Sequence, residues 1–414
     1  MELIKRSLAK IVSDASKTFK VLLLTGPRQV GKTTLLQALL KPGRTTVTLD
    51  DPDLRHLAKS DPELFLSTYP PPLLIDEIQY APELFPYIKM YVDKSTETGQ
   101  FWLTGSQSFL LMRGVSESLA GRVAILKLQG LDTAERNGKV TTPYKPQNRP
   151  KRPGLITTRL ALAKRIFAGT FPQLTAQPKT DISLFMRSYT ATYLSRDIRD
   201  LVKAEHEHEF MTFLTCLAAR AGQLLNASNL SQDVGVSPQT IRAWTSILES
   251  SGVIVMLRPY RTNLTKRATA TPKVYFSDTG LATHLCGIRT PEDLERSQLF
   301  GHMAENYAIM EVLKSWWHRG LPGDASFYRD KEGHEIDLLI KDGPDLHPIE
   351  IKLSAKPNMS EIEANVSALA KTKTKLSLGS IICLTGEDRP YSRDFIYTNI
   401  GNIGLCPSRQ NDSF

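Results

Sequence analysis

The sequence predicts an α/β protein that begins with a helix-covered parallel sheet, continues with helices and ends with a second α/β domain. Apolar segments typical of strands alternate with helix-like segments from residue 20 to 130, a pattern that favours parallel strands with helices on both faces. A helix–turn–helix pattern follows between residues 227 and 257, and residues 300–385 read as helix, three strands, helix and strand. These observations indicate a chain of several domains.

The stretch from Gly26 to Thr33 fits the pattern GxxxxGK[ST], which is typical of loops that hold nucleotide phosphates. An apolar run, 21–24, precedes it and a helix-like stretch, 34–40, follows it. In this context the loop N–H groups and the helix N-terminus face the phosphates. We expect Lys32 to reach the β- and γ-phosphates and the Thr33 hydroxyl to bind Mg²⁺.

A second apolar segment, 73–75, ends in the acids Asp76 and Glu77. Behind a phosphate-binding loop, Asp76 is expected to hold Mg²⁺ and Glu77 to polarise the attacking water. The two acids therefore extend the prediction from ATP binding to ATP hydrolysis.

A third buried strand is expected at 101–105, with Ser106 or Gln107 after it as a polar sensor of the γ-phosphate. Arg122 could act as an arginine finger, in cis or towards a neighbouring subunit, and Arg113 competes with it for this role. The residues expected to contact the nucleotide are Gly26, Pro27, Arg28, Gln29, Val30, Gly31, Lys32, Thr33, Thr34, Asp76 and Ser106.

Composition limits the class of protein. The 414 residues allow two to four domains, and the net charge of +9 hints at a polyanionic partner. The four cysteines have no zinc-ligand or redox spacing, which indicates free thiols in a reducing cytoplasm. Because neither a signal peptide nor an apolar run of about 20 residues is present, we expect a cytoplasmic protein without a membrane partner.

The helix–turn–helix segment predicts a winged helix. Gly235 lies in the turn, Ser237 is a good N-cap, and Pro238 suits the first helical position. Strands at 253–257 and 274–276 would flank a basic wing. The residues expected to contact nucleic acid, mostly at phosphates, are Gln239, Thr240, Arg242, Arg258, Arg261, Lys266 and Arg267. The alternative is that the module packs within the protein or binds another protein.

Towards the carboxyl end, Asp337 and the sequence Glu350-Ile351-Lys352 form a D…ExK arrangement on neighbouring predicted strands. The period of two places Glu350 and Lys352 on one strand face. Asp337 and Glu350 would hold Mg²⁺, Lys352 would orient or deprotonate water, and Glu305 could complete the metal site. The alternative is an exposed strand face with an ordinary Glu–Lys pair.

In this order, the segments resemble a family of bacterial and archaeal AAA-type P-loop ATPases that carry a helical and winged-helix region and a restriction-endonuclease-like PD-(D/E)xK domain. The resemblance rests on GPRQVGKTT, LLIDEIQ, WLTGSQS, SLAGRV, YLSRDI, PKVYFSDTGL, AEN and EIDLLI…IEIK. It implies ATP and Mg²⁺ at the loop, an arginine at Arg122 and a nuclease-type site at Glu305, Asp337, Glu350 and Lys352. The basic, Pro-rich stretch 137–154 is longer than the connection usual in that family.

The expected division of the chain follows from these segments. It comprises an ATPase domain at 1–136, a basic Pro-rich linker at 137–155, a helical region at 156–222, a winged-helix domain at 223–290, a nuclease-like domain at 291–395 and a tail at 396–414.

The predicted function is ATP hydrolysis coupled to nucleic-acid binding, DNA more than RNA, and to metal-dependent phosphodiester cleavage. A different class remains open, in which the protein is an ATP-driven switch whose C-terminal modules bind proteins without cleavage. A transcription regulator with an ATP sensor is a third reading. Action of Arg122 on a neighbouring subunit would imply a homo-oligomer.

Overall fold

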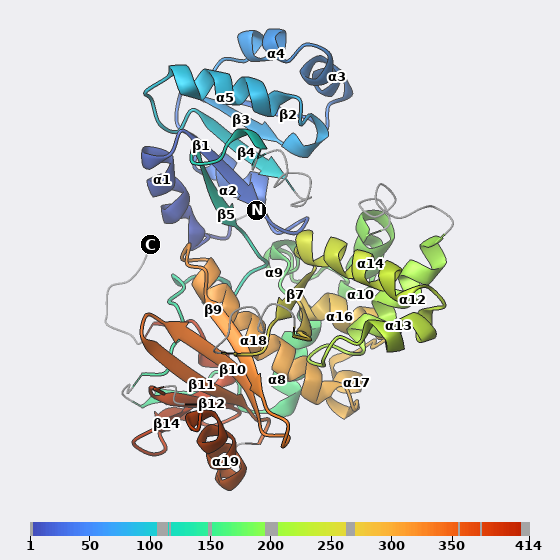
Figure 1. Ribbon diagram of the computed structural model, residues 1–414, viewed down its shortest axis with the longest axis vertical. Helices are drawn as coiled ribbons and strands as arrows, with labels where there is room; N and C mark the ends of the chain where they lie inside the picture. Colours follow the sequence, from blue (N-terminus) through green and yellow to red (C-terminus); the bar gives the residue numbers. More distant parts are fainter. Residues whose placement is uncertain are drawn as a thin grey trace.

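The N-terminal sheet is parallel throughout, as the alternating pattern predicts (Figure 1). The computed structural model describes residues 3–105, 115, 117–147, 151–194, 206–261, 270–354, 357–372 and 375–406. The sheet has the strand order β2-β3-β4-β1-β5. Its strands are β1 (Val21–Thr25), β2 (Thr45–Thr48), β3 (Leu73–Asp76), β4 (Phe101–Gly105) and β5 (Val123–Lys127). As expected, β4 lies between the strands that precede the phosphate loop and the acid pair.

Helices cover both faces of this sheet. Alternation along β1 sends Leu22 and Leu24 to the face covered by α1 and α2, and Val21 and Leu23 to the face covered by α3, α4 and α5. The helices are α1 (Leu8–Thr18), α2 (Lys32–Ala38), α3 (Pro52–Ser60), α4 (Pro62–Thr68), the 3₁₀ turn η1 (Ile78–Tyr80), α5 (Leu84–Lys94) and α7 (Thr133–Arg136). Burial on both faces explains the continuous apolar sequence of β1.

The middle segment contains the predicted helix–turn–helix and its two strands. Gly235 ends the first helix with φ of 80°, and the Ser237 hydroxyl accepts the Thr240 N–H at 3.1 Å at the start of the second. Strands β7 and β8 pair antiparallel. The elements are α8 (Arg159–Ala168), α9 (Pro172–Ala176), α10 (Ile182–Tyr189), the π-helix η2 (Thr190–Leu194), α12 (Glu207–Ala218), α13 (Ala227–Val234), α14 (Pro238–Ser250), β7 (Ile254–Leu257), β8 (Lys273–Phe276), α16 (Thr279–Leu285) and α17 (Pro291–Arg296). These helices and strands are confirmed, and their role as a DNA-binding winged helix stays a prediction.

The C-terminal sheet has the strand order β6-β13-β14-β12-β11-β10-β9. Helix α18, three antiparallel strands, α19 and the parallel strand β12 follow one another as predicted. The elements are β6 (Arg152–Pro153), α18 (Phe300–Trp317), β9 (Asp324–Arg329), β10 (Glu335–Asp342), β11 (Asp345–Ile351), α19 (Met359–Ala370), β12 (Gly379–Cys383), β13 (Glu387–Pro390), β14 (Phe395–Asn399) and the 3₁₀ turn η4 (Ile400–Asn402). The assignment of this sheet to the restriction-endonuclease-like fold stays a prediction.

Two expected boundaries are wrong. The described residues of 137–155 are not an exposed linker: Tyr144 is buried and its hydroxyl lies 2.5 Å from Ser380 Oγ and 2.9 Å from Thr398 Oγ1. Strand β6 pairs with β13, an edge position that tolerates its proline. The predicted tail from 396 contains most of β14, which is buried between β12 and β13. The described part of 137–155 is ordered despite its polar composition because it pairs with strands that are distant in sequence.

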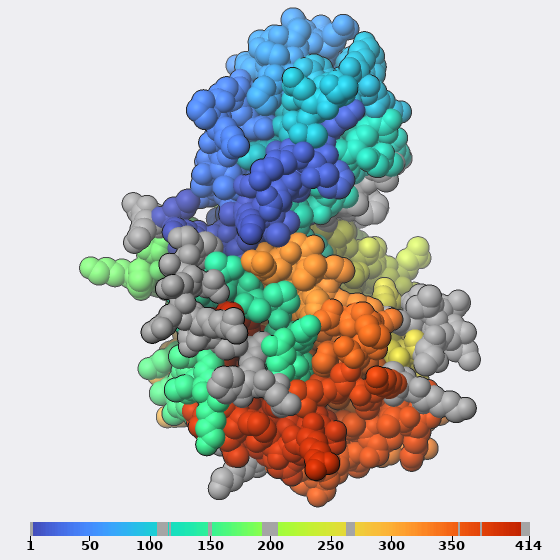
Figure 2. All heavy atoms as spheres, turned by 90° about the vertical axis from the view of Figure 1, so that its left-hand side faces the viewer, coloured from blue at the N-terminus to red at the C-terminus, as the bar shows by residue number. Residues whose placement is uncertain are grey.

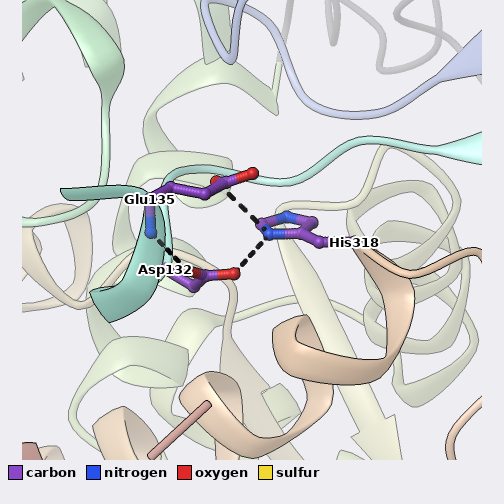
Figure 3. A group of neighbouring side chains, drawn as sticks. All are labelled: Asp132, Glu135 and His318. Carbon is purple, nitrogen blue, oxygen red and sulfur yellow. Dashed lines mark hydrogen bonds and ion pairs between the residues drawn. The ribbon is translucent and has the colours of Figure 1, made fainter. Parts of the chain in front are cut away.

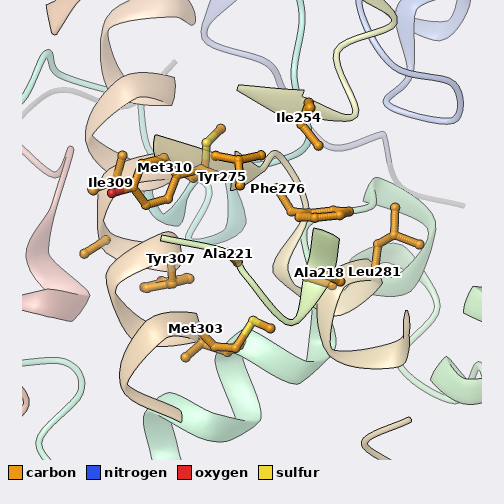
Figure 4. Close-up of a cluster of buried hydrophobic side chains, with 14 of the residues drawn as sticks. Ala218, Ala221, Ile254, Tyr275, Phe276, Leu281, Met303, Tyr307, Ile309 and Met310 are labelled. Atoms are coloured by element: carbon orange, nitrogen blue, oxygen red, sulfur yellow. The ribbon is translucent and has the colours of Figure 1, made fainter. Parts of the chain in front are cut away.

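A single hydrophobic cluster joins the middle helices to the C-terminal sheet, across the expected boundaries at 222 and 290. Figure 4 draws part of it, including Ala218 and Ala221 of the middle segment, Tyr275 and Phe276 of β8 and Met303 of α18. In the space-filling view the blue N-terminal part lies on the orange and red C-terminal part (Figure 2). Among the described residues, no helix has the length and apolar character needed to cross a membrane.

Candidate ATP site and carboxylate site

The phosphate loop connects β1 to α2 through backbone conformations that restrict its sequence. Gly26 has φ of 148°, and a Cβ there would lie 1.9 Å from the Leu128 carbonyl oxygen, so only glycine fits. Gln29, with φ of 58°, and Gly31, with φ of 90°, complete the turn into α2. The Lys32 ammonium donates to the carbonyl oxygens of Gly26 at 3.0 Å and Pro27 at 2.8 Å, which places it at the loop as predicted.

The predicted magnesium ligands and acids meet at the carboxyl ends of β3 and β4. The Thr33 hydroxyl lies 2.7 Å from Asp76 Oδ1, and the Thr104 hydroxyl contacts the same oxygen. The Glu77 N–H donates to Thr104 Oγ1 at 3.2 Å, and the Glu77 carboxylate accepts from the Gln79 amide. Hydroxyl and carboxylate oxygens are donors that suit Mg²⁺, so Thr33 and Asp76 fit that ion.

Thr104 is a site residue that the sequence reasoning missed. It lies two residues before Ser106, the predicted sensor, which falls outside the described residues. Its position at the end of β4 was the available signal, since β4 was expected beside the acid-bearing strand. Arg28, which was expected to contact the nucleotide, donates to the Tyr80 hydroxyl at 3.3 Å.

A cavity of about 740 Å³ opens beside the loop. Its walls combine Val30 and Leu35, from the loop and α2, with Ile4 before α1 and Pro172 at the start of α9. Gln29, Gly31 and Thr34 also line it. A largely apolar cavity next to a phosphate loop suits a nucleobase. No motif marks Ile4 or Pro172, because they reach the cavity only through the fold.

Arg122 is not placed to act as an arginine finger in cis, whereas its action on a neighbouring subunit stays a prediction. Its carbonyl oxygen accepts the N–H of Val21 at the start of β1, whereas the phosphate loop follows the end of that strand. Its guanidinium forms an exposed ion pair with Asp93, with Nη2 3.1 Å from Oδ2. Because β1 has five residues, the end of the sheet at Arg122 lies about 13 Å from the end at the phosphate loop.

The D…ExK residues lie together in the C-terminal sheet. Asp337 on β10 is next to the pair Leu338–Ile349, and its Oδ2 accepts the Ile351 N–H at 2.8 Å. Lys352 Nζ is 3.5 Å from Glu350 Oε2. Glu350 is 1% exposed, and its Oε1 has no hydrogen-bond partner among the described residues.

Burial and crowding of the two acids perturb their protonation. Burial, followed by the charge of Asp337, raises the pKa of Glu350 to about 9. Burial and the charge of Glu305 raise the pKa of Asp337 to about 6, against the opposing effect of Lys273. An unpaired buried carboxylate oxygen beside a second acid fits a divalent cation, because hard oxygen ligands are what such ions prefer.

Glu305 takes part in a different contact from the one expected. Its Oε1 accepts from the Tyr275 hydroxyl at 2.7 Å and from Lys273 Nζ at 3.1 Å. Lys273 is 4% exposed and also lies 2.6 Å from Glu335. Lys273 begins β8, and its buried side chain therefore belongs to this acidic site.

The predicted nucleic-acid contacts are only partly described. Gln239 and Arg242 are exposed on α14, and the Thr240 hydroxyl lies 2.8 Å from Ser237 Oγ. Arg258 and Arg261 are exposed after β7. Lys266 and Arg267 lie outside the described residues. In Figure 1, α14 lies well apart from β10 and β11, so the exposed residues of α14 are distinct from the carboxylate site.

Comparison with known proteins identifies the family. The chain is 31% identical over 358 residues to the uncharacterized protein Rv2008c of Mycobacterium tuberculosis and, to the same extent, to Mb2031c of Mycobacterium bovis, covering 86% of this chain and 75% of each relative. The chain belongs to the family of these mycobacterial proteins. An AAA domain family matches residues 18–137, and two domains of unknown function, DUF8612 and DUF4143, match residues 159–292 and 300–403. The protein therefore carries an ATPase-like P-loop domain.

Two solved structures align with part of this chain. The Walker-type ATPase PABY2304 of Pyrococcus abyssi aligns with a TM-score of 0.43 at 14% identity, covering 68% of this chain and 96% of that one. RuvB of Thermotoga maritima aligns with a TM-score of 0.26 at 16% identity, covering 60% and 86%.

Proposed function

We propose that this protein hydrolyses ATP and uses its nucleotide state to control a divalent-metal-dependent phosphodiesterase site that acts on nucleic acid. The observation that carries the proposal is the buried pair Asp337 and Glu350 beside Lys352, with one Glu350 oxygen unpaired. Burial of two carboxyl groups side by side is costly even next to a lysine, and a fold that retains them commonly does so at a functional site.

The ATP half of the proposal assigns one role to each loop residue. Lys32 and the loop N–H groups bind the β- and γ-phosphates, and the base enters the cavity next to Val30 and Leu35. Thr33 and Asp76 hold Mg²⁺, while Glu77 orients the attacking water. Thr104, which contacts both the Asp76 carboxylate and the Glu77 N–H, fixes the positions of these two acids relative to each other.

The cleavage half rests on the carboxylate site. Asp337 and Glu350 would hold the divalent ion, which when bound supplies charge neutralisation and an activated water for phosphodiester hydrolysis. Lys352, whose side chain faces both acids, would pair with a phosphate oxygen. Burial excludes bulk water from Glu350, which strengthens each of these charge interactions.

Exposed polar and cationic side chains support a nucleic-acid substrate. Gln239 and Arg242 on α14, with Arg258 and Arg261 after β7, offer contacts to phosphates. The net charge of +9 favours association with a polyanion. We propose DNA rather than RNA, because a helix–turn–helix enters the major groove of B-form DNA.

The test combines two assays on the full-length protein. ATP turnover is measured with and without duplex DNA, and DNA cleavage is measured with Mg²⁺ or Mn²⁺. Asp337→Asn, Glu350→Gln and Lys352→Met should abolish cleavage and retain ATP turnover. Asp345→Asn is the matched control, since Asp345 is an exposed acid at the start of β11. Cleavage that persists in all three site variants would refute the nuclease assignment.

A second candidate is an ATP-driven switch that binds a protein partner and does not cleave nucleic acid. Lys273 favours it, because this lysine already bridges Glu305 and Glu335 within the acidic site. This candidate predicts nucleotide-dependent assembly without salt-sensitive DNA binding. Titration of DNA at two salt concentrations separates the candidates, since phosphate contacts weaken steeply with salt.

A further inference from the structure

A buried polar cluster joins the N-terminal domain to the far end of α18. It consists of Arg6, Asp132, Glu135 and His318, all of them at most 6% exposed. Figure 3 shows Asp132 and Glu135 directed towards the His318 ring, each joined to it by a dashed line. Neither the ATP chemistry nor the carboxylate site described above uses these residues.

The buried Arg6 side chain is hydrogen-bonded to the phosphate loop. Its Nη1 donates to the carbonyl oxygen of Val30 at 2.7 Å, and its Nη2 donates to that of Gln129 at 2.6 Å. Its Nε donates to Glu135 Oε2 at 3.0 Å. A planar guanidinium with three fixed donors couples its partners geometrically, so a displacement of Val30 displaces the bond to Glu135 as well.

The cluster continues from Glu135 to α18. His318 Nδ1 lies 2.7 Å from Asp132 Oδ2 and 3.3 Å from Glu135 Oε2. Glu311 and Tyr307, about two and three turns further into α18, bind the backbone N–H and the hydroxyl of Thr133 at 2.7 Å and 3.1 Å. The short helix α7 is therefore fixed to α18 along three turns.

The opposite end of α18 reaches the carboxylate site. Glu305 lies on this helix and contacts Lys273 and Tyr275. The helix is continuous from Phe300 to Trp317 and buried along most of its length, so it moves as one body. At about 1.5 Å per residue, the helix spans about 20 Å between Glu305 and His318.

These contacts form one connected path. We propose that Arg6 is a positioning residue that couples the phosphate loop to α18, through Glu135 and the Asp132–His318 pair, so that nucleotide binding shifts Glu305 relative to Asp337. This proposal rests on one part of the proposed function, namely that ATP binding controls the C-terminal site. Cleavage itself is not required for it.

A metal centre does not explain the cluster. One imidazole and two carboxylates do gather here with their ligand atoms close together. The Arg6 guanidinium, however, already donates to Glu135 and supplies the positive charge that the acids need. Burial of Asp132 would raise the pKa of its carboxyl, but hydrogen bonds from His318, Thr141 and the backbone lower it to about 2, as expected for an acid satisfied by protein donors.

The test uses hydrogen exchange and ATP binding on the full-length protein. In the wild type, a non-hydrolysable ATP analogue with Mg²⁺ should change amide exchange in residues 300–306 and 335–352. His318→Gln should keep ATP turnover within about twofold and reduce that change at least fivefold. Arg6→Lys, which keeps the charge and loses the three-donor geometry, should weaken both. His56→Gln, an exposed substitution on α3, is the control and should behave as wild type.

Reciprocity supplies a second measurement. Because coupling between two sites acts in both directions, Glu305→Gln should change the affinity for the ATP analogue by about fivefold or more in the wild type and not in the His318→Gln background. A response of the distant residues that survives both His318→Gln and Arg6→Lys overturns the coupling path. An absent response in the wild type overturns it too, whereas lack of DNA cleavage with an intact response counts only against the nuclease function.

Discussion

Replacement of Glu350 by glutamine should stabilise the protein at alkaline pH while it removes the proposed metal site. Burial next to Asp337 raises the pKa of Glu350 from an ordinary value of 4.5 to about 9. The folded state therefore binds this proton more tightly than the unfolded state does. This contribution to stability is complete below pH 4.5 and is lost as the pH rises towards 9.

The linkage relation gives the size of the effect. With these two pKa values, the contribution of Glu350 to the free energy of unfolding falls by about 1 kcal/mol up to pH 5 and by on the order of 5 kcal/mol up to pH 8. A neutral glutamine of the same shape does not titrate. Glu350→Gln should thus be close to wild type at pH 5 and more stable by several kcal/mol at pH 8.

The assay is urea unfolding of wild type and Glu350→Gln at pH 5 and pH 8, each with and without millimolar Mg²⁺. Magnesium should stabilise the wild type at pH 8, because a bound cation replaces the proton, and should leave Glu350→Gln unchanged. Asp345→Asn serves as control and should follow the wild type at both pH values. Equal destabilisation of Glu350→Gln at pH 5 and pH 8 would refute the reasoning, because it would mean that the carboxyl is ionised and paired in the folded state.

Three further outcomes are expected. Lys32→Ala should weaken ATP binding about 10- to 100-fold by calorimetry, since it removes a charged donor to the phosphates, and normal binding would contradict the loop assignment. Arg122→Ala should leave ATP turnover of dilute protein within about twofold, because its ion pair with Asp93 is exposed and lies at the opposite sheet edge; a large loss that appears only at high protein concentration would instead reveal a homo-oligomer with Arg122 acting in trans. Arg242→Ala should lower DNA affinity for all sequences alike and reduce the salt slope by about one, and an unchanged slope would place the DNA elsewhere.

Sequence reasoning succeeded where the chemistry lies within a short contiguous segment. The loop from Gly26 to Thr33 dictates its own geometry, because Gly26 alone tolerates the approach of Leu128. Likewise, the period of two along β11 was enough to place Glu350 and Lys352 together, and antiparallel pairing brought Asp337 to them. The cis role of Arg122 fails because of topology: Arg122 precedes a strand, and parallel strands place such residues at the end of the sheet opposite the nucleotide. Its role towards a neighbouring subunit stays a prediction.

The remaining site residues depend on contacts between distant segments. Arg6 and Glu135 are 129 positions apart, and no local pattern relates them. Lys273 follows a basic stretch of the sequence, yet on β8 its ammonium contacts Glu305. Its true role depends on which face of β8 packs against α18, and that is decided by tertiary packing rather than by composition.

The pairing of β6 with β13 also has a consequence for how the chain folds during synthesis. Tyr144 and its partner Ser380 are 236 positions apart. At the usual translation rate of about 5–20 residues per second, the segment around Tyr144 waits for ten seconds or more before its partner strands exist. During that interval the N-terminal sheet can complete its fold, while the basic stretch after it stays unpaired and open to polyanions. The C-terminal sheet therefore closes last, and it closes around a segment made long before it.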